Sequence, residues 1–153
     1  MIDDPALRET VTAAGHLMAA TREPWWIIGS AAVALHLARP AAVTDVDVLL
    51  DLDDAQRLLP MIGLAPVAGT AHPDFRSAVF GRWLGSALPV EFMAGFRHRT
   101  ADGWRLVYPD TRQCILIDST TVYVPGKAEL HDLLVAFGRP KDVKRAQQLA
   151  DVM

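Results

Sequence analysis

Two aspartates, Asp45 and Asp47, stand one residue apart in the apolar stretch TDVDVLL. Successive side chains of a strand alternate between its faces, so both carboxylates are expected on one face, with Val46 and Val48 on the other. Two unit charges about 6 Å apart repel by roughly 3 kcal/mol at an effective dielectric constant near 20. A divalent cation such as Mg²⁺ or Mn²⁺ would remove this conflict, because Mg²⁺ binds carboxylate oxygens together with substrate phosphates. The alternative is that both aspartates are ordinary solvated residues at the start of a strand.

A third candidate ligand is Glu91, an isolated acid in the apolar stretch LPVEFMAGF. A buried carboxylate is costly unless it is paired or bound to a metal, so an acid between Val90 and Phe92 needs an explanation. If its strand lies beside that of Asp45 and Asp47, the three carboxylates would converge on a site for one or two metal ions. The alternative is an edge strand on which Glu91 faces solvent.

A Gly-Ser pair precedes the aspartates. The apolar run PWWIIG ends at Gly29, and a stretch rich in alanine and leucine begins at Ser30. A turn from strand to helix gathers free backbone N–H groups at the positive end of the helix, which suits a phosphate group. Glycine allows a close approach of the backbone, and the serine hydroxyl offers a further donor and a helix cap. Gly-Ser before a helix is also common in turns, so the pair is informative only together with the acids.

Helices and strands that would position these residues alternate in the first half of the chain. Amphipathic periodicity predicts the helices, and short apolar runs predict the strands. Helices are expected at 5–21, 30–38 and 52–63, and strands at 24–29 and 46–51. Asp4 is the expected cap of the first helix and Asp53 or Asp54 that of the third, which Pro60 should shorten or bend.

The second half of the chain is expected to be mostly strands, followed by two helices. The strands are predicted at 75–83, 90–96, 104–108, 114–118 and 121–125, and the helices at 128–137 and just after Pro140. The first two strands, joined by GSALP, form a predicted hairpin. This order predicts an α+β fold with α/β character, in which helices flank a mixed β-sheet. At this length we expect one domain, residues 1–153.

Composition argues against several classes of protein. The formal net charge is −3, with 15 basic and 18 acidic residues, so extended nucleic-acid binding is not expected. No apolar run approaches the roughly 20 residues of a membrane helix. The N-terminus does not resemble a secretory signal, and a single cysteine, Cys114, cannot form an internal disulfide, so a cytoplasmic location is expected. Cys114 is expected to be inert packing within an apolar strand.

Taken together, these motifs resemble the nucleotidyltransferase superfamily of the polymerase-β type. The pattern is similar to that of its small single-domain bacterial members, which include lincosamide and aminoglycoside nucleotidyltransferases and toxin–antitoxin-associated proteins. The resemblance implies that Gly29 and Ser30 bind the phosphates of a nucleoside triphosphate. It also implies that Asp45, Asp47 and Glu91 are catalytic and bind Mg²⁺ or Mn²⁺. Two further stretches share the resemblance, ARPAAVTDVDV around the aspartates and FGRPKDVKRAQQL near the C-terminus.

This resemblance implies transfer of a nucleoside monophosphate from the triphosphate, ATP or another, to an acceptor hydroxyl, with release of pyrophosphate. Relatives often have a lysine near Leu134 and an aspartate at Arg145; neither is present, so Lys127 is predicted to contact the nucleotide instead. For Arg139 and Lys141, capping of a helix start is the simpler expectation. The missing lysine favours an alternative, a non-catalytic nucleotide- or protein-binding module such as one partner of a toxin–antitoxin pair. A small α/β binding domain outside the superfamily is the third alternative.

Several arginines are candidates for a substrate-binding rim. Arg97 and Arg99 in GFRHRT and Arg76 in HPDFRS are predicted to border the substrate, with solvated loops as the alternative. Loops at 66–76 and 94–103 are expected to shape the acceptor pocket. The acceptor itself, whether a small molecule, a protein or an RNA end, is left open, as is the formation of homo-oligomers.

Overall fold

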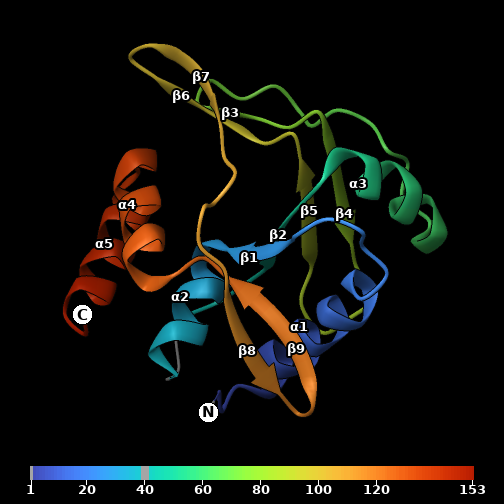
Figure 1. The fold of residues 1–153 in the computed structure, drawn as a ribbon, viewed down its shortest axis with the longest axis horizontal. Coiled ribbons are helices and arrows are strands. Elements are labelled where there is room, and N and C mark those ends of the chain that lie inside the picture. The colour runs from blue at the N-terminus through green and yellow to red at the C-terminus, as the bar shows by residue number, and fades with distance from the viewer. Residues whose placement is uncertain (1, 39–41) are drawn as a thin grey trace.

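The computed structural model describes residues 2–38 and 42–153, so the Arg39-Pro40 pair lies outside the described residues. Its centre is a four-stranded sheet in the order β1-β2-β5-β4 (Figure 1). The strands are β1 Trp26–Ile28, β2 Val46–Leu50, β4 Val79–Trp83 and β5 Val90–Ala94. β2 and β5 run parallel, whereas β1–β2 and β4–β5 are antiparallel. The sheet is therefore mixed, as predicted.

Helices flank this sheet and confirm the α+β fold. They are α1 Pro5–Met18, α2 Gly29–Leu37, α3 Leu52–Leu58, α4 Lys127–Phe137 and α5 Pro140–Ala150. The Asp4 carboxylate caps α1 by accepting hydrogen bonds from the backbone N–H groups of Ala6 and Leu7. In the part of the chain that the structure describes, no helix is both long enough and apolar enough to cross a membrane.

The third helix differs from its prediction at both ends. Asp51, which directly follows β2, caps α3 by accepting a hydrogen bond from the N–H of Asp53. The expected cap at Asp53 or Asp54 was wrong because both residues already belong to the first helical turn. The α-helix ends at Leu58 and continues as a 3₁₀ helix, Leu59–Ile62, consistent with the shortening expected from Pro60.

A second sheet, in the order β3-β6-β7, lies beyond one end of the first (Figure 1). Its strands are β3 Phe75–Arg76, β6 Arg97–Thr100 and β7 Gly103–Leu106. Two predictions were wrong here: the strand at 75–83 is divided between the two sheets, and the loop expected at 94–103 contains β6. In both segments the chain passes from one sheet to the other at the same place in the fold. Gly95 has φ +58°, and a Cβ there would lie 2.8 Å from the Cβ of Ala78, so the crossing requires glycine.

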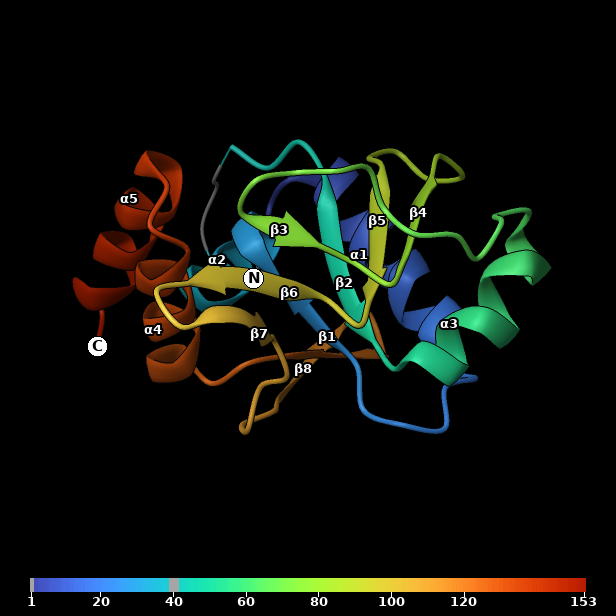
Figure 2. The same cartoon turned by 90° about the horizontal axis from the view of Figure 1, so that it is seen from above.

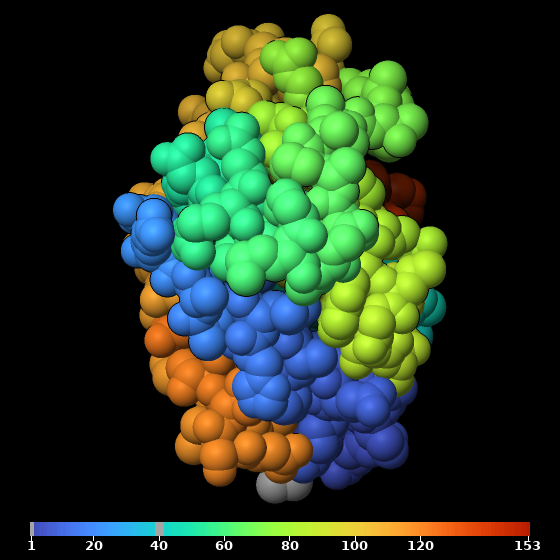
Figure 3. Space-filling model, turned by 90° about the vertical axis from the view of Figure 1, so that its right-hand side faces the viewer, coloured from blue at the N-terminus to red at the C-terminus, as the bar shows by residue number. Residues whose placement is uncertain are grey.

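The main core lies on one face of the central sheet. Ile27, Val48 and Phe92 are neighbours across β1, β2 and β5, and all three are fully buried in the core cluster that includes the apolar residues of α1. Each such side chain contributes roughly 1.5–3 kcal/mol to stability. Figure 3 shows α1, α3 and the segment after α3 closing the side of the molecule away from the C-terminal helices. Because this face is buried, the alternate residues of β2, including Asp47, must lie on the opposite face.

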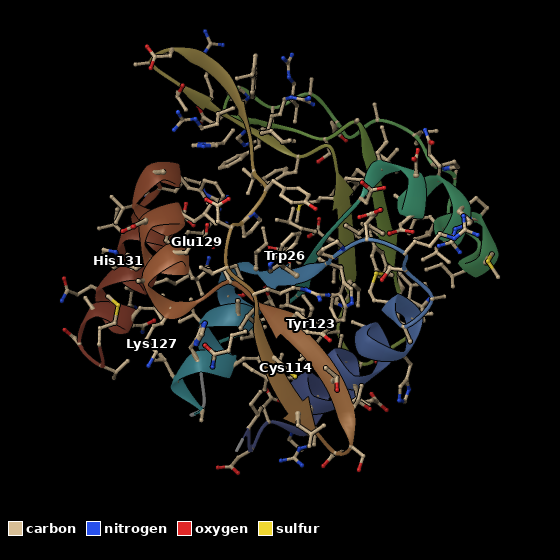
Figure 4. All side chains as sticks on the ribbon, in the orientation of Figure 1. Trp26, Cys114, Tyr123, Lys127, Glu129 and His131 are labelled. Carbon is tan, nitrogen blue, oxygen red and sulfur yellow. The ribbon has the colours of Figure 1, made fainter. Side chains whose placement is uncertain are left out.

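A third sheet is a hairpin of β8 Gln113–Ile117 and β9 Thr120–Val124. Val122 and Val124 of β9 are fully buried in the main core, whereas β8 is the outer strand. Cys114 lies on β8 and is exposed, so its predicted role in packing was wrong (Figure 4). Hydrophobicity alone could not show which of two similar apolar strands would face the core.

Candidate active site

One row of side chains crosses the face of the central sheet opposite α1. Asp47 is the register partner of Ile28 on one side and of Glu91 on the other, and Glu91 is in turn paired with Arg82. Asp45 lies two residues before Asp47 and therefore points to the same face. One oxygen from each of the three acids lies within 4.8 Å of the other two. The strand order thus brings Asp45, Asp47 and Glu91 together.

Gly29, the residue after β1, lies against Asp47. Its φ is +67°, in the left-handed region that side chains disfavour. A Cβ at this position would lie 2.8 Å from Oδ2 of Asp47, closer than real Cβ atoms approach other atoms. Both the backbone conformation and the neighbouring carboxylate therefore require glycine here.

Helix α2 begins at Gly29, and its first two residues line the same pocket as the three acids. The N-cap residue is Ile28, and no side chain caps this end of the helix. The expected capping role of Ser30 was wrong because the helix begins one residue earlier than predicted. An uncapped helix start carries free N–H groups and partial positive charge, which suit an anionic ligand.

Two of the acids, Asp47 and Glu91, have a raised pKa. Burial is the main cause that raises the pKa of Asp47 to about 7, and the charges of Asp45 and Glu91 add to it. Burial also raises the pKa of Glu91 to about 7, helped by the hydrogen-bonded carboxyl of Asp45. Arg145 and Arg139 act on Asp47 in the opposite direction. Three converging carboxyl groups, two of which have a raised pKa, form a set of hard oxygen donors, and this set fits a divalent cation such as Mg²⁺ or Mn²⁺.

Affinity for such a cation is expected to fall steeply below pH 7. The metal competes with protons for Asp47 and Glu91, whose pKa values are about 7. Between pH 8 and pH 6, affinity for Mn²⁺ should drop about tenfold if one proton is displaced and about a hundredfold if two are. Calorimetric titration in two buffers of different ionisation enthalpy would measure both the affinity and the protons released. Equal affinity at the two pH values would contradict a site made of these carboxylates.

The three acids line a pocket of about 340 Å³. The rest of its polar lining includes Gly29, Ser30, Thr44, Gly69, Thr70, His72, Arg76, Arg139, Lys141 and Arg145. The apolar lining includes Ile28, Phe75, Phe80, Met93, Phe96, Leu134 and Phe137. The pocket therefore has a highly charged part and a largely aromatic part, and residues of the 66–76 segment contribute to its lining.

Helix α5 supplies positive charge to this pocket. Its buried Asp142 accepts hydrogen bonds from Nε of Arg139 at 2.6 Å and from Nη2 at 3.1 Å, and it also accepts one from the Arg139 backbone N–H. Arg145 lies 3.9 Å from the same carboxylate. Arg139 therefore does take part in capping, yet it also lines the pocket with Lys141 and Arg145. The FGRPKD motif was the only sequence signal for this group, and it did not show that Arg145 would face the acids.

Other predicted site residues are dispersed. Arg76 lines the pocket, whereas Arg97, Arg99 and Lys127 are not part of its described lining. Lys127 is the first residue of α4 (Figure 4), and Phe137, which does line the pocket, is the last. These two residues are about 15 Å apart along the axis, given a rise of about 1.5 Å per residue. The helix direction thus keeps Lys127 away from the acids.

Comparison with known proteins bears on the fold. A scan against protein-family models and a search of curated proteins each find no match. Among solved structures, a proposed nucleotidyltransferase from Thermotoga maritima is 19% identical, with a TM-score of 0.71 over 100% of this chain and 97% of that one. The lincosamide antibiotic adenylyltransferase LnuA, bound to lincomycin, is 13% identical, with a TM-score of 0.59 over 92% and 94% of the two chains. ANT(2'')-Ia in complex with adenylyl-2''-tobramycin is 14% identical, with a TM-score of 0.57 over 94% and 88%.

The protein therefore has the fold of the nucleotidyltransferase superfamily. Within that fold, the structures it resembles include an adenylyltransferase of lincosamide antibiotics. At these identities the likeness establishes the fold, as the sequence resemblance predicted, and the chemistry depends on the site.

Proposed function

We propose that this protein is a metal-dependent nucleotidyltransferase formed by one domain, residues 1–153. It transfers a nucleoside monophosphate from a nucleoside triphosphate to an acceptor hydroxyl and releases pyrophosphate. The observation that supports this most directly is the convergence of Asp45, Asp47 and Glu91 against Gly29. Since LnuA is an adenylyltransferase, ATP is the first nucleotide to test.

The three acids are assigned to the metal. Asp45, Asp47 and Glu91 offer the carboxylate oxygens that Mg²⁺ or Mn²⁺ prefers. Without a cation, the positive groups of the pocket do not fully offset the negative charge of these acids, as the raised pKa of Asp47 shows. A bound cation would supply neutralisation of the phosphate charge and polarisation of the α-phosphate.

The phosphates of the nucleotide are assigned to residues at or near the starts of α2 and α5. Backbone N–H groups at Gly29 and Ser30 would bind phosphate oxygens, and the missing Cβ of Gly29 allows that close approach beside Asp47. From α5, Arg139, Lys141 and Arg145 would balance the charge of the triphosphate and of the departing pyrophosphate. Lys127 is not needed for this role.

Glu91 is assigned as the general base that takes the proton of the acceptor hydroxyl. The hydroxyl oxygen forms a bond to the α-phosphorus, the bond from that phosphorus to the bridging oxygen breaks, and pyrophosphate leaves with the electron pair. With its proton displaced by the cation, Glu91 would be held as a carboxylate, the form that can accept the proton of the hydroxyl in such a step. Arg76, at the pocket rim, is placed to contact the acceptor or the nucleotide.

Nucleotide binding is expected to require the metal. With Mn²⁺ or Mg²⁺ and ATP at about 100 times its dissociation constant, the folded state should gain about 2.7 kcal/mol, or a rise in Tm of roughly 5–10 °C. Either ligand alone should give a much smaller shift. Differential scanning fluorimetry with all four nucleotides would measure this, and no response to any of them with either metal would refute the proposal. Labelled nucleotide incubated with cell extract would then show which molecule receives the label.

A further inference from the structure

The outer side of the second sheet carries a concentration of arginine. Cross-strand pairing places Arg76 beside Arg97, and Arg99 beside Trp104. Residues two apart on a strand share a face, so these four side chains lie on one face together with Leu106, the partner of Arg97. We call these five residues the basic face. The same register places Phe75 and His98 on the opposite face, where His98 packs against Phe137 of α4.

These arginines have no acidic partners. Four of the ten residues in β3, β6 and β7 are arginine, including Arg105 on the opposite face, and none is acidic. Within the described chain, none of the four forms an ion pair, although Asp74 and Asp102 adjoin the strands. Arg97 donates one hydrogen bond, to the backbone oxygen of Gly95. Because a folded protein normally disperses or pairs such charges, an unpaired group of this kind indicates an anionic ligand.

An aromatic ring lies among these charges. The guanidinium of Arg76 lies 4.2 Å from the ring centroid of Trp104, and that of Arg99 lies 5.9 Å away. Leu106, next to them, is 48% exposed. Planar guanidinium groups around a partly exposed indole match the surfaces on which nucleic-acid bases stack while their phosphates bind arginine. An acidic peptide would satisfy the charges but would not use the ring.

The basic face adjoins the candidate active site. Arg76 belongs both to this face and to the lining of the pocket that holds Asp45, Asp47 and Glu91. On the opposite face of the second sheet, Phe75 stacks on Phe96 and packs edge to face against Phe137 of α4. In Figure 2 the three strands lie over the central sheet beside α4. Arg76, on the edge strand β3, is therefore the residue through which the basic face adjoins the pocket, whose aromatic lining lies on the opposite face of this sheet.

We propose that the basic face binds the end of a single-stranded nucleic acid and that the hydroxyl at this end is the acceptor; the second part rests on the proposed function. Arg97 and Arg99 bind phosphates, Trp104 stacks on a base, and Arg76 guides the terminal nucleotide into the pocket. The face spans three short strands and takes only a few nucleotides. This is compatible with a net charge of −3, because only one small area needs to be positive.

Fluorescence anisotropy with an unstructured 12-nucleotide RNA, without metal or nucleotide, tests binding apart from catalysis. Replacing both Arg97 and Arg99 with glutamine should weaken binding at least about tenfold and reduce the salt slope by roughly 1.4, since each phosphate contact in a single strand contributes about 0.7. Trp104→Leu should weaken binding at least about fivefold with an unchanged salt slope.

The matched control replaces Arg22 and Arg112 with glutamine; Arg112 also covers an aromatic ring, that of Tyr123, but belongs to the far β8–β9 side. This control should bind RNA as the parent does.

Three results would overturn the inference. They are no binding of RNA by the parent, equal loss of affinity in the control, or displacement of RNA by polyglutamate of equal charge as effectively as by unlabelled RNA. If the parent still responds to metal and ATP, the proposed function survives each of them.

The acceptor assignment is tested with labelled ATP: RNA with a 3'-hydroxyl should be labelled and the same RNA with a 3'-phosphate should not. Labelling of neither by a protein that binds both metal and RNA would refute that assignment.

Discussion

Asp47→Asn is expected to abolish nucleotidyl transfer and, without metal, to make the protein more stable at pH 8. Asp47 is half-buried beside two other acids, and its raised pKa means that the folded protein binds a proton that the unfolded chain releases. Stability from this carboxyl is therefore fully present below about pH 4 and is lost as the pH rises through about 7. Asparagine keeps the shape and removes the charge.

Urea unfolding in EDTA at pH 5 and pH 8 would show this effect. We expect Asp47→Asn to be more stable than the parent by about 1–3 kcal/mol at pH 8 and by roughly a third of that amount at pH 5, since the pKa shifts from 3.8 to about 7, one pKa unit corresponds to 1.36 kcal/mol and solvent screens part of the shift. His36 and His98, whose pKa values are lowered mainly by burial, titrate in both proteins and cancel in the difference. Transfer should fall at least about a hundredfold, because loss of a ligand removes several kcal/mol of charge stabilisation.

The matched control is Asp3→Asn, which removes an exposed charge far along the chain from the site. It should behave as the parent in both assays. If Asp47→Asn instead kept the stabilisation by metal and nucleotide, the acids would not be the metal site. If it were less stable than the parent at pH 8 without metal, the three carboxylates would not repel one another as described.

Gly29→Ala is expected to disrupt the site with a moderate loss of stability. The left-handed backbone costs alanine roughly 1–2 kcal/mol, and the new Cβ would in addition press on Oδ2 of Asp47 from 2.8 Å. Relief of this contact must move either the carboxylate or the start of α2, and both are assigned to the reaction. We expect transfer to fall at least about a hundredfold, as a displacement of about 1 Å can cause.

Gly63→Ala separates these two effects. Gly63 has φ +81°, so alanine meets a similar backbone cost, but no atom lies within 4 Å of the added Cβ. Urea unfolding should show a loss of about 1–2 kcal/mol in this control with unchanged transfer per folded molecule. If Gly29→Ala retained transfer to the same extent as Gly63→Ala, the close approach at Asp47 would have no role in the reaction.

Short sequence patterns were sufficient to predict an element where the interactions that form it lie close together in sequence. The cap of α1 at Asp4, the start of α2 near Gly29, and β2 with its alternating residues are all visible in short windows. The divided strand at 75–83 was not, because its hydrophobic pattern continues through the point where the chain leaves one sheet for another. That division depends on Gly95, in the bend between β5 and β6, which passes close to Ala78.

By itself, the sequence determined that Asp45 and Asp47 share a face of β2, because side chains alternate in a strand whose other face is apolar. Only the tertiary structure decided that β5 pairs in parallel with β2, so that Glu91 meets Asp47. It also decided that Arg145, rather than Lys127, faces the acids. Alternation is a property of a few consecutive residues, whereas the choice of a neighbouring strand or helix depends on how the whole chain buries its apolar faces, and no local window contains that information.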